Sequence, residues 1–122
     1  MTPLGLRLRQ LREERGISLK QMAEALRVSS AYLSALEHGK RGKPTWMLLQ
    51  RIIAYFNIIW DEAEELQRLA ELSDPRVTVD TAGMSPEATE FANRLARDIG
   101  QLAPDDLAFL SFELRRRIGR DG

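Results

Sequence analysis

The stretch 28-VSSAYLSALEHGKRGKP-44 combines a short helix signal with a strongly basic loop. Ser29 is a residue type favoured at helix N-caps, and Gly39 is one favoured where helices end. Between them, apolar residues recur at helical spacing. Three cations follow within four residues, at positions 40, 41 and 43. The pattern predicts a helix over 29–37 and a basic loop over 39–44, and one explanation is that the helix lies in a groove of DNA while the loop holds the phosphates beside it.

Similar helix signals lie on both sides of this stretch. Thr2 followed by proline predicts a first helix that stops at Gly16, and Ser18 with Gln21 fits the capping box of a second. Thr45 is expected to cap a fourth helix, and a fifth follows it. The apolar stripes of the five helices are Leu4, Leu8 and Leu11; Met22, Ala23 and Leu26; Leu33 and Leu36; Leu49, Ile52, Ile53 and Phe56; and Trp60, Ala63, Leu66, Leu69 and Ala70. With no convincing strand signal, we expect an all-α fold.

A second helical region is expected after a break in the pattern. Proline, glycine and polar residues predict a linker over residues 73–85. Within it, residues 77–79 alternate Val-Thr-Val, which fits either a short extended segment paired with its copy in a dimer or a plain linker, and we favour the linker. Helix starts at Ser85-Pro86 and at Pro104 then predict a helical hairpin over residues 86–122.

The composition is that of a globular chain, with 43% apolar residues among 122. No apolar run approaches the roughly 18 residues of a membrane span, and the N-terminus lacks the layout of a secretion signal. Cysteine is absent, which excludes disulfides, thiolate nucleophiles and zinc–thiolate sites. The sequence has one histidine and lacks a glycine-rich phosphate loop. We therefore expect no enzyme activity, no metal site and no cofactor site. A reducing cytoplasm suits a chain without cysteine.

Charge is divided unevenly along the chain, although the formal net charge is zero. Residues 1–57 hold 10 Lys and Arg but 4 Asp and Glu, whereas residues 58–122 hold 8 and 14. A basic half joined to an acidic half predicts one surface for a polyanion such as double-stranded DNA and another surface for a different role. The alternative is that the two sets of charges attract each other.

Over residues 6–57 the sequence resembles the helix-turn-helix domain of the Cro/phage-repressor (XRE) family of DNA-binding proteins. LRQLREERGISLKQMAEAL is similar to the first two helices of that family, and RVSSAYLSALEHGKRGKP to its turn, its recognition helix and the Glu, Gly and Pro that follow. The resemblance implies a five-helix, lambda-repressor-like domain over residues 1–72. It also implies a sequence-specific transcriptional regulator, a repressor that works as a homodimer.

The resemblance implies which side chains meet DNA. The recognition helix and its end supply the base contacts, which are Ser30, Ala31, Tyr32, Ser34, Ala35 and His38. The first two helices and the loop supply the phosphate contacts, which are Arg7, Arg9, Lys20, Gln21, Lys40, Arg41 and Lys43. For the single cations outside the loop, a solvated surface charge is the alternative. For His38 it is an exposed residue at a helix end.

The resemblance also implies an ion pair between Arg12 and Glu37, which pins the first helix to the third more than it stabilises the fold. Two residues depart from the family pattern. Leu19 stands where a glutamine often bonds a phosphate, and Arg27 stands where the turn usually has glycine. If Arg27 keeps a left-handed backbone, the cost is about 1 kcal/mol.

The small size of the base-contacting side chains is a third departure. Serine and alanine alternate there, with no arginine for guanine and no asparagine or glutamine for adenine. Alanine can contact a thymine methyl group, and serine can bond many base edges. We therefore expect specificity to rest on methyl contacts, bridging water and DNA deformability.

The hairpin is expected to dimerise the chain, because it carries more apolar side chains than two helices can bury against each other. The dimerisation residues are Phe91, Leu95, Ile99, Leu107, Leu110 and Leu114. The alternative is that they pack on residues 46–72 of their own subunit. A second function also remains open, that of an antitoxin or adaptor whose acidic half captures a protein partner while DNA binding is autoregulatory.

Overall fold

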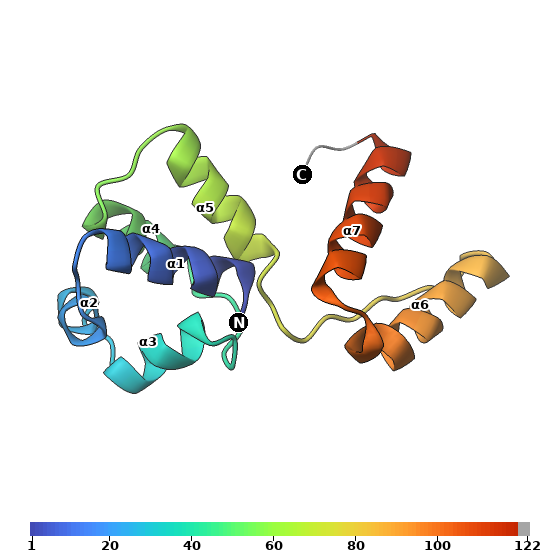
Figure 1. Ribbon diagram of the computed structural model, residues 1–122, viewed down its shortest axis with the longest axis horizontal. Helices are drawn as coiled ribbons and strands as arrows, with labels where there is room; N and C mark the ends of the chain where they lie inside the picture. Colours follow the sequence, from blue (N-terminus) through green and yellow to red (C-terminus); the bar gives the residue numbers. More distant parts are fainter. Residues whose placement is uncertain (120–122) are drawn as a thin grey trace. The chain divides into compact units, whose positions relative to one another are not determined.

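The computed structural model of the protein describes residues 1–119 and is all helical over that range, as the sequence predicts (Figure 1). The chain divides into two compact units, Met1–Val77 and a second that begins at Thr78. The first unit holds α1 (Pro3–Glu14), α2 (Leu19–Leu26), α3 (Ser30–Glu37), α4 (Trp46–Tyr55) and α5 (Asp61–Glu71). The second holds α6 (Pro86–Asp98), the 3-10 helix η1 (Ile99–Gln101) and α7 (Pro104–Ile118).

The first four helices begin at the caps that the sequence predicts. The hydroxyl of Thr2 accepts a hydrogen bond from the Gly5 amide at 3.0 Å, and that of Ser29 accepts from the Tyr32 amide at 3.0 Å. Ser18 and Gln21 form the expected reciprocal box. These side chains satisfy amides that have no acceptor within their own helix, so each helix start is fixed locally.

The leucine-rich stripes of the five helices meet in one core. α1 packs against α3 on one side and α5 on the other, while α2 packs against α3 and α4. In Figure 1, α5 lies above α1 and α3 lies below it. The side chains that are almost completely buried come from all five helices: Leu4, Leu8, Met22, Leu26, Leu33, Ile52 and Leu66. The recognition helix is therefore held by the core along one side only.

α1 and α3 cross at very close range. Gly5 lies against the backbone of Glu37, and a Cβ atom at Gly5 would stand 2.8 Å from the Glu37 carbonyl carbon and 2.9 Å from its Cα. No side chain fits there without moving one of the helices. Glycine at position 5 therefore sets the distance between α1 and the recognition helix.

An ion pair fixes the same crossing. Nε of Arg12 donates to Glu37 Oε2 at 3.1 Å, and a terminal nitrogen of the guanidinium donates to Oε1 at 3.2 Å. The other terminal nitrogen donates to the Ile17 carbonyl. The Glu37 side chain is only 2% exposed, and its hydrogen bonds raise the pKa of Arg12. The pair therefore ties α1 to the end of α3.

The turn between α2 and α3 contains the residue that departs from the family pattern. Arg27 has φ 59° and ψ 41°, a left-handed conformation that glycine adopts more easily. Its amide still donates to the Glu24 carbonyl at 3.2 Å. Across the core, the Arg51 guanidinium of α4 donates to the Leu26 carbonyl at the end of α2. These hydrogen bonds hold the turn despite the backbone cost.

The prediction that Trp60 packs inward on the fifth helix is wrong. α5 begins one residue later, and Trp60 precedes it with φ 55° and an 80% exposed side chain. Ile58 is buried in its place. The acidic first turn of α5, Asp61, Glu62 and Glu64, favours a helix that begins at Asp61, because negative charge is stabilised at a helix N-terminus. Among the described residues, 77–79 form no strand.

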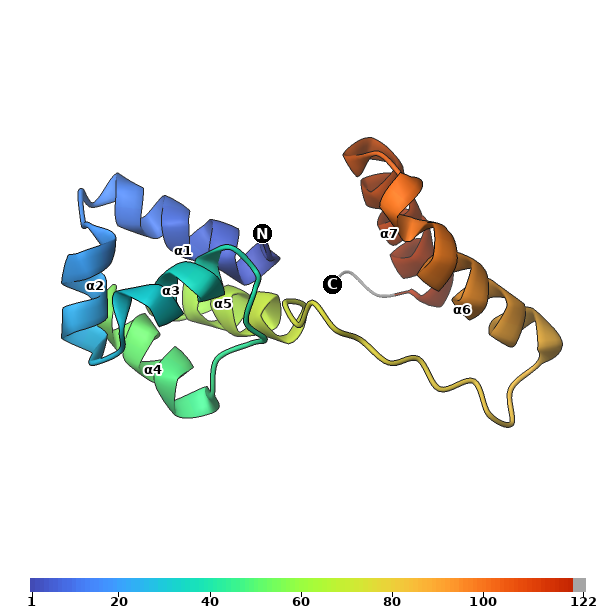
Figure 2. The ribbon, with the colours of Figure 1, turned by 90° about the horizontal axis from the view of Figure 1, so that it is seen from below.

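The second unit leaves its apolar side chains uncovered. α6 and α7 meet at η1 and form an open V in Figure 1, while the two helices overlap in the view of Figure 2. Neither helix has a buried residue. The exposed large apolar side chains are Phe91, Leu95, Ile99, Leu107, Phe109, Leu110, Phe112, Leu114 and Ile118. The two helices therefore carry far more apolar surface than they cover.

Replacing Arg12 with Met is expected to destabilise the protein by about 3 to 5 kcal/mol, because the Glu37 carboxylate stays buried without a partner. The double variant Arg12→Met, Glu37→Met should recover most of that loss, since it buries no charge. Urea unfolding followed by circular dichroism measures both.

Arg9→Met, which breaks the exposed Arg9–Glu13 pair, is the matched control and should cost under about 1 kcal/mol. A single variant Arg12→Met as stable as the double variant would contradict the role assigned to the pair.

Candidate DNA-binding surface

The recognition helix α3 has an inner and an outer side. Leu33, Leu36 and Glu37 are buried in the first unit. The residues predicted to contact bases lie outside this set: Ser30, Ala31 and His38 are exposed, and Tyr32, Ser34 and Ala35 are half-buried. The structure leaves Ser30, Ala31, Ser34, Ala35 and the C-cap residue His38 outside the buried side of α3, whereas Tyr32 packs partly against the core.

The outer side of α3 carries small side chains, and the imidazole ring of His38 lies at its end. Nδ1 of His38 donates to the Ser34 carbonyl at 2.8 Å, which orients the imidazole along the end of the helix and leaves Nε2 for an external partner. The hydroxyls of Ser30 and Ser34 can donate or accept. Such a surface allows the helix to approach a flat or grooved partner closely, because no long side chain stands in the way.

The loop after α3 places three cations beside the helix. The Lys40 amide donates to the Ala35 carbonyl at 2.9 Å, so the loop folds back on the end of α3. The Arg41 guanidinium lies over the Tyr32 ring, 5.7 Å from its centroid, and Pro44 is buried. Within residues 1–119, none of Lys40, Arg41 and Lys43 forms an ion pair with a carboxylate. Their charge is therefore directed to solvent next to α3.

The start of α2 holds two further predicted phosphate contacts. Lys20 and Gln21 are exposed there. The side-chain oxygen of Gln21 accepts from the Ser18 amide at 2.8 Å, so only its amide nitrogen remains for a phosphate. Arg9 of α1 is also exposed, but Nε pairs with Glu13 at 3.1 Å. A phosphate contact by Arg9 requires that pair to open.

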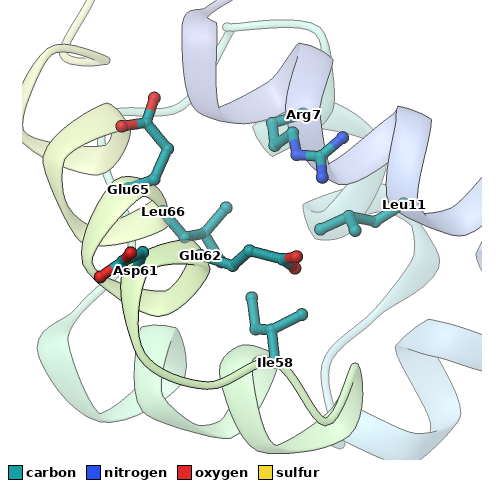
Figure 3. A pocket seen from close by; sticks show the side chains of 7 residues that line it. All are labelled: Arg7, Leu11, Ile58, Asp61, Glu62, Glu65 and Leu66. Carbon is teal, nitrogen blue, oxygen red and sulfur yellow. The ribbon is translucent and has the colours of Figure 1, made fainter.

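The structure does not bring Arg7 together with the other predicted phosphate contacts. It lines a cleft of about 300 Å³ between α1 and α5, on the side of α1 away from α3. Figure 3 shows Arg7 and Leu11 facing Glu62 and Leu66 across this cleft. A hydrogen bond from Arg68, together with the charges of Arg68 and Arg7, lowers the pKa of Glu65 at its rim. The acidic residues of α5 make this cleft unsuited to a polyanion.

Two exposed residues at the start of α4 were missed by the sequence analysis. Trp46 and Met47 directly follow the Thr45 cap, and both side chains are exposed beside the basic loop. A signal was available, since neither residue falls on the stripe formed by Leu49, Ile52 and Ile53.

Over residues 1–119, no helix is long and apolar enough to cross a membrane. In the same range, histidine and carboxylate side chains do not gather into a group that could hold a metal ion.

A model of a helix-turn-helix domain family matches residues 3–66, which is just over half of the chain. The HTH-type transcriptional regulator DdrOP3 of Deinococcus deserti is 35% identical over 119 residues, a match that covers 94% of this chain and 84% of that protein. The HTH-type transcriptional regulator SinR of Bacillus subtilis is 31% identical over 68 residues, which is 52% of this chain and 61% of SinR.

A longer regulator matches part of this chain as well. RamB of Mycobacterium tuberculosis is 37% identical over 82 residues, which is 65% of this chain but 17% of RamB. Among solved structures, a SinR protein/SinI protein complex contains a similar chain, with 25% identity, a TM-score of 0.45 and coverage of 93% of this chain and 97% of that chain.

The matched segment contains α1 to α4 and the first turns of α5, and so includes the whole surface formed by α3 and its basic loop. The chain belongs to the XRE family of helix-turn-helix transcriptional regulators.

Proposed function

We propose that this DNA-binding regulator is a homodimeric, sequence-specific repressor that inserts α3 into the major groove and holds the flanking phosphates with its basic loop. One observation carries the proposal. Three cations that have no carboxylate partner among residues 1–119, Lys40, Arg41 and Lys43, border the uncovered side of a helix whose outer side chains are small. That combination matches a phosphate backbone next to an open groove.

The base contacts available to α3 are limited by its side chains. The methyl groups of Ala31 and Ala35 suit the thymine methyl, and the hydroxyls of Ser30 and Ser34 suit several base edges. None makes the paired hydrogen bonds that arginine makes to guanine. Sequence preference then depends on methyl contacts, water and the deformability of the site.

The second unit supplies the dimer. The nine exposed large apolar side chains on its helices α6, η1 and α7 exceed what a monomeric protein usually leaves in contact with water. Two copies of the unit can cover these side chains against each other. Dimerisation also sets two recognition helices on one DNA, with half-sites about 34 Å apart. A bound dimer of this kind blocks a promoter, and repression is assigned on that basis. The proposed location is the cytoplasm.

Replacing Lys40, Arg41 and Lys43 with Ala is expected to flatten the salt dependence of DNA binding. If a dimer neutralises about 8 phosphates, the slope of log affinity against log salt is near −7. Loss of six cations per dimer reduces the magnitude of this slope by about 5. Binding should weaken alike for all sequences. Fluorescence anisotropy of a labelled duplex over a range of salt concentrations gives the slope.

Arg68→Ala on α5 is the matched control and should leave the slope unchanged. Equal slopes for the loop variant and the unmodified protein would show that the loop does not meet phosphates.

In-vitro selection from random duplexes at about 0.15 M salt is expected to yield a two-fold symmetric motif with half-sites about ten base pairs apart. Ala31→Arg should change the selected bases, because it adds a long donor to the outer side of α3. Ile59→Arg adds the same side chain on the loop between α4 and α5 and should leave the motif as it was. An unchanged motif with Ala31→Arg would place α3 outside the groove.

Sedimentation equilibrium is expected to give twice the 13.9 kDa mass of the chain. Phe112→Asp should shift the protein to the monomer and weaken DNA binding, because a charge is then buried at the interface. Ile59→Asp is the matched control in the first unit. A monomeric unmodified protein would contradict the homodimer. A second protein that co-purifies in equal amount would favour the adaptor function instead.

A further inference from the structure

Helix α7 carries apolar side chains on two sides. On one side lie aliphatic residues, which are Leu107, Leu110, Leu114 and Ile118. Phe109 and Phe112 lie on the other side, because a step of two residues turns an α-helix by about 200°. Their side chains are 64% and 55% exposed. A single partner helix cannot cover both sides of α7, so the phenylalanine side needs an occupant of its own.

Charged residues of opposite sign stand at the two ends of the phenylalanine side. Asp105 precedes Phe109 by four residues, and Arg116 follows Phe112 by four. Steps of four, three and four residues keep these side chains within about 60° of one another around the helix, as in the seam of a coiled coil. We call this set the phenylalanine seam: Asp105, Phe109, Phe112 and Arg116.

Both charged residues of the seam are available to a partner. Asp105 is exposed and forms no ion pair within residues 1–119. Arg116 is exposed and pairs with Glu113 of its own helix. An exposed pair of this kind contributes little to stability. Arg116 can therefore exchange Glu113 for a carboxylate of another chain.

The order of residue types along the seam is the same in both directions, apart from the sign of the charges. Counted from the midpoint between Leu110 and Ser111, a phenylalanine comes second on either side. Aspartate comes sixth toward the start of α7, and arginine comes sixth toward its end. Two antiparallel copies of α7, related by a two-fold axis at that midpoint, therefore place phenylalanine against phenylalanine and aspartate against arginine. Parallel copies would place like charges together at both ends.

We propose that the phenylalanine seam binds the same seam of a second copy of this chain, with the two α7 helices antiparallel and with Asp105 and Arg116 selecting the partner. The inference rests on the proposed homodimer and adds the residues that choose its partner and orient its helices. The aromatic rings supply the apolar contact. The charges supply specificity, because a helix without this reversed charge order meets a like charge at one end or loses an ion pair.

The test is the dissociation constant of the dimer of the full chain, measured by sedimentation equilibrium over a range of protein concentrations. Arg116→Asp should raise it by at least about tenfold, because two contacts between opposite charges become contacts between like charges. Arg117→Asp is the matched control. Arg117 also pairs with Glu113, at 2.9 Å, but lies about 100° away from Arg116 around the helix. The control should change the constant by less than about twofold.

The double variant Asp105→Arg, Arg116→Asp separates pairing from folding. It restores opposite charges in an antiparallel pair, so its dissociation constant should return to within about threefold of that of the unmodified protein. The double variant should form no mixed dimer with the unmodified chain, because like charges then meet at both ends. Native mass spectrometry of a mixture with one isotope-labelled chain detects mixed dimers, and circular dichroism checks the helix content of each variant.

Equal dissociation constants for Arg116→Asp and Arg117→Asp would overturn the inference, leave the homodimer standing and leave the seam to a different protein. Mixed dimers of the double variant and the unmodified chain would show parallel helices and would overturn it as well. An unmodified chain that stays monomeric would overturn both the inference and the proposed homodimer.

Discussion

The ion pair between Arg12 and Glu37 fixes the rotation of α3 about its own axis. Glu37 is the last residue of the helix, and its carboxylate is reached from α1 by two guanidinium nitrogens. Because Gly5 keeps the two helices in close contact at the same point, α3 can neither turn nor move away. The identity of the outward residues follows from this constraint rather than from any contact that those residues make.

Charge is separated in the first unit along the length of α5. The basic loop lies near the C-terminal end of α5, where Lys43 lines a cleft with Glu71, whereas the acidic first turn lies at the other end of that helix. Salt screens the carboxylates of that first turn over about a Debye length. They therefore cancel little of the positive potential of the loop. A chain of zero net charge can therefore still present a surface attractive to DNA.

Local signals made most of the fold predictable. Thr2, Ser18, Ser29 and Thr45 each accept a hydrogen bond from an amide only three residues away, so their role is visible in the sequence alone. The caps and the apolar stripes predict where the helices lie, and the spacing within the stripes predicts which residues form the core. Tertiary contacts were not visible in this way. The bond from Arg51 to the end of α2 and the exposure of Trp60 depend on residues far apart in the chain.

The candidate site was predictable only in part, where its residues depend on local sequence signals. The loop cations and the outer residues of α3 follow directly from the position of one short helix. Arg7 was assigned from its charge, yet its place in the α1–α5 cleft depends on the packing of a helix more than fifty residues away. Met47 was overlooked because an apolar residue off the inner stripe has no obvious partner until the neighbouring α3 is placed beside it.

The division of α3 into an inner and an outer side has an evolutionary consequence. Ser30, Ala31, Ser34 and Ala35 contribute no side chain to the buried core, whereas Leu33, Leu36 and Glu37 do. Substitutions on the outer side are therefore nearly neutral for stability. After gene duplication, a copy of this regulator could acquire a new target sequence through a few changes on one helix, without first accumulating compensating changes in the core.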